Sequence, residues 1–171
     1  MGNPCNTNAL IACANAPSIS SRQFTAMTRL DQNRAVGQIA EHAGVPASAV
    51  RDVFIWGNHA NTMYPDPRFG TVGGLPITNL IDAEWLQGQF IETVSTRGKA
   101  IIVARGASSA ASAASAAIDH MRDWWQGTNG RIVSMAIPSE GWYGVPEGLV
   151  FSFPCRCENG GIVVLSLIHI S

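Results

Sequence analysis

The sequence is poor in charged residues, and its two signs of charge nearly cancel. Asp, Glu, Lys and Arg make up 13% of the 171 residues, and the formal net charge is −1. Nucleic-acid binding needs a basic stripe that neutralises phosphates, whereas the few Lys and Arg residues here are scattered along the chain. With 46% hydrophobic residues, the composition indicates one folded core and no nucleic-acid partner.

A long apolar segment is also missing. The longest such stretch runs from Ile162 to Ile170, and Ser166 and His169 interrupt it. A helix that crosses a membrane needs roughly 20 apolar residues. The first residues, Met1 to Asn6, contain neither a secretory signal nor a myristoylation pattern. We therefore expect no membrane partner and a cytoplasmic location.

Cysteine is sparse, and its spacing does not fit a zinc site. The four cysteines are Cys5, Cys13, Cys155 and Cys157. Reduced thiols, without a metal, are the expected state in the cytosol.

Hydrophobic spacing and turn formers predict helices over much of the chain. Helices are expected at 6–14 and 28–42, and one or two more at 79–97, where Gly88 weakens the pattern. The short apolar run Ala100–Ala104 fits either a strand or the start of a helix.

The alanine-rich stretch Gly106–Trp125 predicts one long helix, because it lacks glycine after its first residue and alanine is the best helix former. Four of its residues are predicted to fill a core at helical spacing, namely Ile118, Met121, Trp124 and Trp125.

Apolar and β-branched runs predict strands. Val50–Trp56 is expected to be one buried strand, followed by loop and short strand over 58–76. A small antiparallel sheet is expected from Ile132–Ile137, Leu149–Phe153 and Gly161–Leu165. The predicted fold class is α+β, with helices packed on a small mixed or antiparallel sheet.

Reactive side chains concentrate at Asp31, Arg34 and His59. Asp31 and Arg34 share a helix face, and His59 directly follows the predicted strand. A carboxylate that accepts an imidazole N–H fixes the histidine tautomer, which suits the histidine to exchange a proton with a substrate hydroxyl. A guanidinium nearby can hold a substrate carboxylate in two hydrogen bonds. Together these residues indicate a site for a hydroxy acid.

Each residue also has an ordinary structural interpretation. Thr28-x-x-Asp31 has the form of a capping box, so Asp31 could serve only its helix. Arg34 could pair with Asp31 or with Glu41 on the surface, and His59 could be a satisfied loop histidine. Spacing alone leaves both interpretations open.

Five motifs resemble, in order and spacing, the signatures of the malate dehydrogenases, members of the lactate/malate dehydrogenase superfamily. The motifs are Gly2-Asn3-Pro4-x-Asn6-Thr7-Asn8, Leu30-Asp31-x-Asn33-Arg34, Trp56-Gly57-Asn58-His59, Ala104-Arg105-Gly106-x-Ser108-Ser109-Ala110 and Gly144-x-Pro146-Glu147-Gly148. The resemblance runs from residue 2 to about residue 163 and implies the C-terminal catalytic domain of that superfamily.

The resemblance implies a role for each matching residue. His59 would be the proton donor and acceptor, Asp31 its carboxylate partner, and Arg34 a ligand for a carboxylate of malate or oxaloacetate. Asn3 would touch both the substrate and the nicotinamide end of NAD, and Gly2 would line the cofactor beside it. One serine among residues 108–112 would lie near the nicotinamide.

The family also has parts that this sequence does not match. Its Rossmann half binds the cofactor pyrophosphate with a glycine-rich turn, and no G-x-G-x-x-G precedes Asn3. The mobile loop with two arginines that recognise the distal carboxylate belongs to that half. We expect residues 1–20 to be a remnant of the NAD-binding domain and residues 21–171 to be the substrate-binding domain, with an off-pattern tail at 162–171.

The expected function is NAD-dependent interconversion of (S)-malate and oxaloacetate, a step of the tricarboxylic acid cycle, in an enzyme that forms homodimers. One alternative is a non-catalytic fragment that associates with itself or with an intact subunit. Another is a lactate-type dehydrogenase. Such enzymes use Asp, Arg and His in the same roles, but they match the motifs around Asp31 and His59 less closely.

Overall fold

The computed structural model describes residues 3–166, which form five α-helices and eight short strands. The helices are α1 (Cys5–Ala14), α2 (Arg29–Ala43), α3 (Ala83–Gln87), α4 (Gln89–Arg105) and α5 (Ala111–Gln126). The strands are β1 (Val50–Arg51), β2 (Phe54–Trp56), β3 (Tyr64–Asp66), β4 (Thr71–Val72), β5 (Leu75–Pro76), β6 (Val133–Pro138), β7 (Val150–Glu158) and β8 (Gly161–Val164). Single turns of 3-10 helix lie at Ser21–Gln23, Ala47–Ala49, Ile77–Asn79 and Trp142–Gly144.

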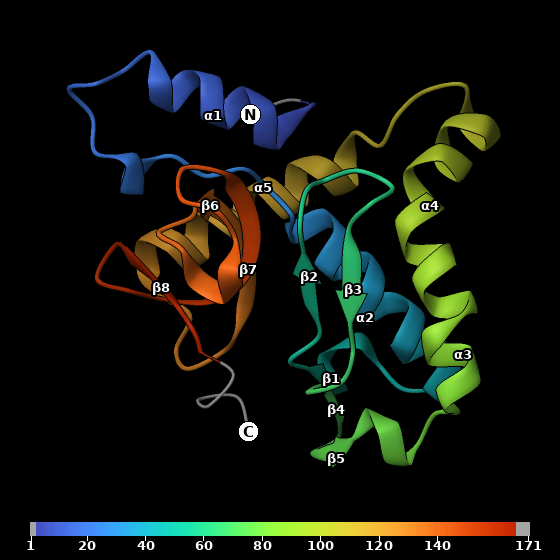
Figure 1. Ribbon diagram of the computed structural model, residues 1–171. Coiled ribbons are helices and arrows are strands. Elements are labelled where there is room, and N and C mark those ends of the chain that lie inside the picture. The colour runs from blue at the N-terminus through green and yellow to red at the C-terminus, as the bar shows by residue number, and fades with distance from the viewer. Residues whose placement is uncertain (1–2, 167–171) are drawn as a thin grey trace.

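Three small antiparallel sheets surround a central helix. Their strand orders are β1-β4-β5, β2-β3 and β6-β7-β8. Helix α2 lies in the middle and contacts α4 on one side and α5 on the other, while α5 packs on the β6-β7-β8 sheet (Figure 1). The predicted α+β class is confirmed, and the sheets are antiparallel rather than mixed.

Two hydrophobic clusters stabilise this arrangement. The larger one joins α2 to β1, β2, α3 and α4 through fully buried side chains such as Ile39, Ile55 and Phe90. The second one lies on β6 and β7 around Met135 and Phe153. Burial of such side chains contributes roughly 1.5–3 kcal/mol each, so the larger cluster holds α2 firmly against β1, β2, α3 and α4.

The prediction of one continuous strand over Val50–Trp56 is wrong. Asp52 adopts a positive φ of 56°, a left-handed conformation that short polar residues tolerate better than most others. The turn divides the segment, so that β1 pairs with β4 and β2 pairs with β3. The local sequence is apolar on both sides of Asp52, which is why hydrophobicity alone suggested one strand.

Two helix boundaries differ from the sequence predictions. The run Ala100–Ala104 belongs to α4, which ends at Gly106 in a left-handed conformation with φ 70°. Helix α5 begins only at Ala111, so the prediction of one helix from Gly106 is wrong over 106–110. A glycine at such a C-terminus lets the chain turn away and releases the following residues from the helix.

The prediction that four α5 side chains fill a core is wrong for three of them. Ile118, Met121 and Trp125 are 66%, 54% and 81% exposed, and Trp124 is partly buried, with its Nε1 donating to the carbonyl of Gly160 at 3.0 Å. The buried residues of this helix are Ala116, His120 and Asp123. On this inward face Asp123 forms ion pairs and His120 Nε2 lies at hydrogen-bond distance from Thr25, which hydrophobic spacing does not reveal, while His120 Nδ1 has no partner in residues 3–166.

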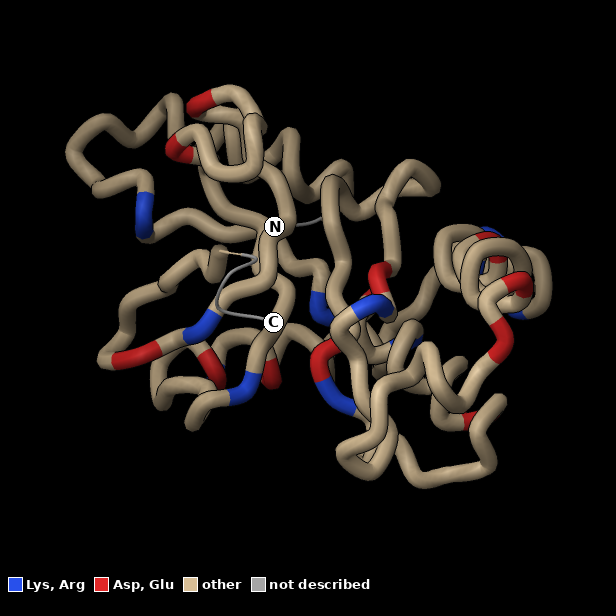
Figure 2. Tube along the Cα trace, turned by 60° about the horizontal axis from the view of Figure 1, so that its bottom comes forward, with Lys and Arg blue, Asp and Glu red and all other residues tan. Residues whose placement is uncertain are grey.

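Charges of both signs are interspersed along the trace (Figure 2). Within residues 3–166, no cluster of three or more His, Cys, Asp or Glu residues is arranged to hold a metal ion. No helix in that part of the chain is long and apolar enough to span a membrane. Gly2 and the end of the predicted tail, residues 167–171 with His169, lie outside the described residues.

Candidate active site

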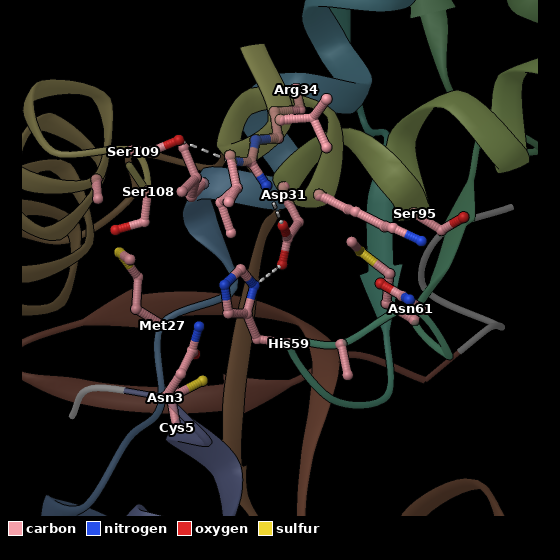
Figure 3. Close-up of a pocket in the computed structure, with 18 residues that line it drawn as sticks. Asn3, Cys5, Met27, Asp31, Arg34, His59, Asn61, Ser95, Ser108 and Ser109 are labelled. Atoms are coloured by element: carbon pink, nitrogen blue, oxygen red, sulfur yellow. Dashed lines mark hydrogen bonds and ion pairs between the residues drawn. The ribbon is translucent and has the colours of Figure 1, made fainter. Parts of the chain in front are cut away.

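The structure brings together the three reactive residues that the sequence singled out. Asp31 and Arg34 lie on α2, and His59 follows β2. The fully buried Asp31 carboxylate forms a hydrogen bond through Oδ2 with His59 Nδ1, and Oδ1 accepts a hydrogen bond from Arg34 Nη1 at 3.3 Å. Figure 3 shows Asp31 between the other two side chains. One carboxylate therefore orients both a histidine and an arginine.

The capping-box interpretation of Asp31 is wrong. Thr28 precedes α2, but its side chain makes no capping hydrogen bond and instead lies 2.8 Å from the Ser152 hydroxyl. The surface pairing of Arg34 with Glu41 does not occur either, because the guanidinium is turned toward Asp31 and its side chain is only 12% exposed.

Asn6 on α1 holds the loop that carries His59. Its Oδ1 accepts a hydrogen bond from the backbone N–H of His59 at 3.1 Å, and its Nδ2 donates to the carbonyls of Gly57 and Val150 at 3.3 and 3.0 Å. Gly57 has a φ of 94°, a conformation that glycine adopts without strain. Sequence reasoning assigned Asn6 no role, although it stands in the first of the five motifs.

Gln32 fixes α2 against the strand that leads to His59. Its Nε2 donates to the Val53 carbonyl, and its Oε1 accepts from the Ser134 backbone N–H, both at 3.0 Å. The Ser134 hydroxyl in turn accepts from the backbone N–H of Ile55 at 2.9 Å. These buried bonds set the distance between Asp31 and His59, and only the position of Gln32 beside Asp31 could have pointed to them.

The three residues face a cavity of about 860 Å³. Its wall includes apolar side chains from the start of α2 and from α4, namely Met27, Leu30, Ile102 and Val103. Asn3 and two of the predicted serines, Ser108 and Ser109, also line it. In Figure 3 the second ring nitrogen of His59 points away from Asp31, toward the side where Met27 and Asn3 lie. That nitrogen is therefore available to a bound molecule.

Comparison with known proteins identifies the family. Residues 28–171 match the family described as lactate/malate dehydrogenase, alpha/beta C-terminal domain. The chain belongs to the lactate/malate dehydrogenase family. This confirms the family that the five motifs suggested.

Solved structures of both kinds of enzyme resemble the chain. A malate dehydrogenase from Naegleria fowleri is 49% identical, with a TM-score of 0.89 over 96% of this chain and 51% of that one. A Trichomonas vaginalis lactate dehydrogenase in complex with NADH and oxamate is 38% identical, with a TM-score of 0.93 over 96% of this chain and 52% of that one. A Salinibacter ruber malate dehydrogenase is 28% identical, with a TM-score of 0.79 over 99% and 56%. The chain thus spans about half the length of these proteins.

In this family member, Arg34 has more N–H donors than its hydrogen bonds to Asp31 and Ser109 use. Its Nη2 donates to the Ser109 hydroxyl at 3.2 Å, in addition to the bond from Nη1 to Asp31. Burial lowers the pKa of Arg34 and the positive charge of Arg97 lowers it further, whereas Asp31 opposes the shift. A guanidinium has five N–H donors and stays charged in proteins, so the remaining donors can bind a carboxylate.

Two other reactive groups are unsuited to catalysis near neutral pH. Burial, together with the charge of Arg29, lowers the pKa of His120 to about 4, so this histidine is neutral, and its Nε2 lies 2.9 Å from the Thr25 hydroxyl. Cys5 lines the cavity, but burial and the Asp31 charge raise the pKa of its thiol. A protonated thiol is a poor nucleophile, so neither of these two groups is suited to the chemistry of the site.

Proposed function

We propose that the chain is the substrate-binding half of an NAD-dependent malate dehydrogenase, which interconverts (S)-malate and oxaloacetate. The observation that carries the proposal is the contact of one buried carboxylate, Asp31, with both His59 and Arg34 beside a cavity. Asp31 thus holds both a proton acceptor, His59, and a cation that can bind a carboxylate, Arg34. This combination suits the oxidation of a 2-hydroxy acid.

In this proposal His59 moves the proton. Because Asp31 accepts the N–H at Nδ1, the opposite nitrogen, Nε2, carries the lone pair and accepts the proton of the C2 hydroxyl of malate. The imidazolium that forms is stabilised by the Asp31 charge and returns the proton when oxaloacetate is reduced. Asp31 acts as the positioning carboxylate of the pair.

Arg34 binds the carboxylate next to the reacting carbon. The planar guanidinium donates two parallel hydrogen bonds to a carboxylate, which fixes the orientation of C2 relative to His59. Ser109 and Asp31 hold the guanidinium in the cavity wall, so little side-chain freedom is lost when the substrate binds.

NAD, when bound, would supply the acceptor for the hydride of malate C2. The apolar part of the cavity wall, with Met27, Ile102 and Val103, fits a nicotinamide ring. Asn3 and Ser108 would border the ring, and Gly2 would line the cofactor beside Asn3. The pyrophosphate and adenosine would be bound by the other half of the enzyme.

Malate is favoured over lactate because the Naegleria fowleri malate dehydrogenase is 49% identical and the Trichomonas vaginalis lactate dehydrogenase 38% identical. The complete enzyme would be a cytoplasmic homodimer of the tricarboxylic acid cycle. The competing proposal is a non-catalytic fragment that only associates with itself or with an intact subunit.

Oxidation of NADH tests the proposal. We would measure it with oxaloacetate and with pyruvate, in the purified chain and in a completed enzyme, meaning this chain fused to the amino-terminal half of the Naegleria fowleri malate dehydrogenase. His59→Ala controls for contaminating host enzyme. Activity with oxaloacetate that disappears in the variant is expected. Faster turnover of pyruvate would point to a lactate dehydrogenase, and no His59-dependent activity in either protein would favour the non-catalytic fragment.

A further inference from the structure

Helix α4 presents one face to the cavity, and a lysine lies in the middle of that face. The residues that line the cavity are Ser95, Gly98, Lys99 and Ile102, with Val103 beside them. Positions i, i+3, i+4 and i+7 lie on one side of a helix. The other α4 cations, Arg97 and Arg105, do not line the cavity, so Lys99 is the charge that this helix contributes to it.

The charge of Lys99 has no partner within residues 3–166. None of the ion pairs in that part of the chain includes it, and its side chain is exposed. The carboxylate of the cavity wall, Asp31, already contacts Arg34 and His59 through its two oxygens. The lining cations Arg34 and Lys99 therefore outnumber the lining carboxylate Asp31 by one, which favours anionic ligands.

Lys99 borders the part of the cavity that Arg34 occupies. A Cβ atom built at Gly98 would lie 3.7 Å from Nη1 of Arg34, and Lys99 is the next residue along the helix. The absence of a side chain at Gly98 leaves room for the guanidinium against α4. Two cations with different geometry thus face the same space: a fixed planar fork and a flexible ammonium.

We propose that Lys99 is a specificity-determining residue, whose ammonium binds the second carboxylate of a dicarboxylic acid while Arg34 holds the first. The inference rests on the proposed function, because it assumes that Arg34 binds the carboxylate next to C2. It extends that function, since the resemblance assigns the distal carboxylate only to arginines of the other half. Lys99 would thus give the substrate-binding half its own preference for dicarboxylates.

Malate and lactate provide a matched pair of probes, because malate carries a second carboxylate where lactate has only a methyl hydrogen. We would titrate (S)-malate and (S)-lactate into the 171-residue chain and follow the NMR resonances of the cavity residues. The ratio of the two Kd values measures the preference. Lys99→Met is expected to lower the preference for malate about threefold, the scale of a partly exposed ion pair, and to leave lactate binding unchanged. Lys99→Arg should retain the preference.

Arg97→Met is the matched control, because it removes the same charge from a different face of α4 without altering the cavity wall. An equal effect of Arg97→Met and Lys99→Met would overturn the inference in favour of a general field effect. An unchanged preference in Lys99→Met would overturn it directly.

Turnover gives a second readout that separates the two proposals. In the completed enzyme, Lys99→Met should lower the ratio of kcat/KM for oxaloacetate to that for pyruvate by a similar factor. His59-dependent turnover with an unchanged ratio would overturn the role of Lys99 and leave the proposed function standing. A chain that binds neither acid, together with a completed enzyme that turns over neither, would overturn both.

Discussion

Asp31 determines the chemistry of the site at the scale of single residues. Its two oxygens are divided between His59 and Arg34, so the carboxylate fixes the imidazole tautomer and the direction of the guanidinium together. The sequence predicted which residues would meet, because Asp31 and Arg34 share a helix face and His59 follows a strand. It could not predict which oxygen serves which partner, since that depends on how α2 packs on β2.

The planar fork of Arg34 leads to a prediction about substrate binding. Arg34→Lys keeps the positive charge but loses the paired donors, so KM for oxaloacetate in the completed enzyme should rise on the order of tenfold to a hundredfold. Arg97→Lys makes the same change at an exposed α4 position outside the cavity and should leave KM within about twofold. Equal KM values for Arg34→Lys and the parent would show that Arg34 does not hold the substrate.

At the scale of helices and strands, buried polar contacts between elements fix the positions of these side chains. Gln32 joins α2 to β2 and β6, and Asn6 joins α1 to the loop after β2. Apolar runs bounded by turn formers and helix stop signals predicted α1, α2 and the β6-β7-β8 strands. Hydrophobicity failed at Asp52 and on α5, where a left-handed residue and a polar inward face replaced the expected apolar pattern.

Two glutamines on α2 allow a matched test of these contacts. Gln32→Ala leaves the Val53 carbonyl and the Ser134 N–H without partners, so the free energy of unfolding should fall by about 1–3 kcal/mol. Gln38→Ala on the same helix removes only an exposed bond to Glu41 at 3.2 Å and should change it by less than about 0.5 kcal/mol. Urea denaturation measures both, and similar losses would contradict a special role for Gln32.

At the scale of the whole molecule, a buried polar cluster connects α2 and α5 behind the site. Asp123 forms ion pairs with Arg29 and with Arg131, the latter at 2.5 Å. His120 lies beside them and is 3% exposed. The burial of this cluster and the pairing of Arg29 with Asp123 could not be predicted from local sequence, because these two residues are 94 positions apart.

His120 makes the stability of the fold depend on pH. Its folded pKa of about 4 lies below the ordinary value of 6.5, so between these values the unfolded chain binds a proton that the folded chain does not. Stability therefore falls as the pH drops from about 6.5 to about 4, by up to about 3 kcal/mol. Urea denaturation across this range should show that His120→Gln removes this part of the slope, whereas His42→Gln at an exposed position retains it. An unchanged slope in His120→Gln would contradict the assignment.

The central claim is that Asp31 and His59 act as one catalytic unit. A double-mutant cycle tests it most directly. The measurement is kcat for NADH oxidation by oxaloacetate in the completed enzyme, for the parent, Asp31→Asn, His59→Ala and the double variant. Each single change should lower kcat on the order of a hundredfold to ten-thousandfold. Because the two side chains act together, the double variant should be no slower than His59→Ala. Losses that multiply in the double variant, or an active His59→Ala enzyme, would contradict the account.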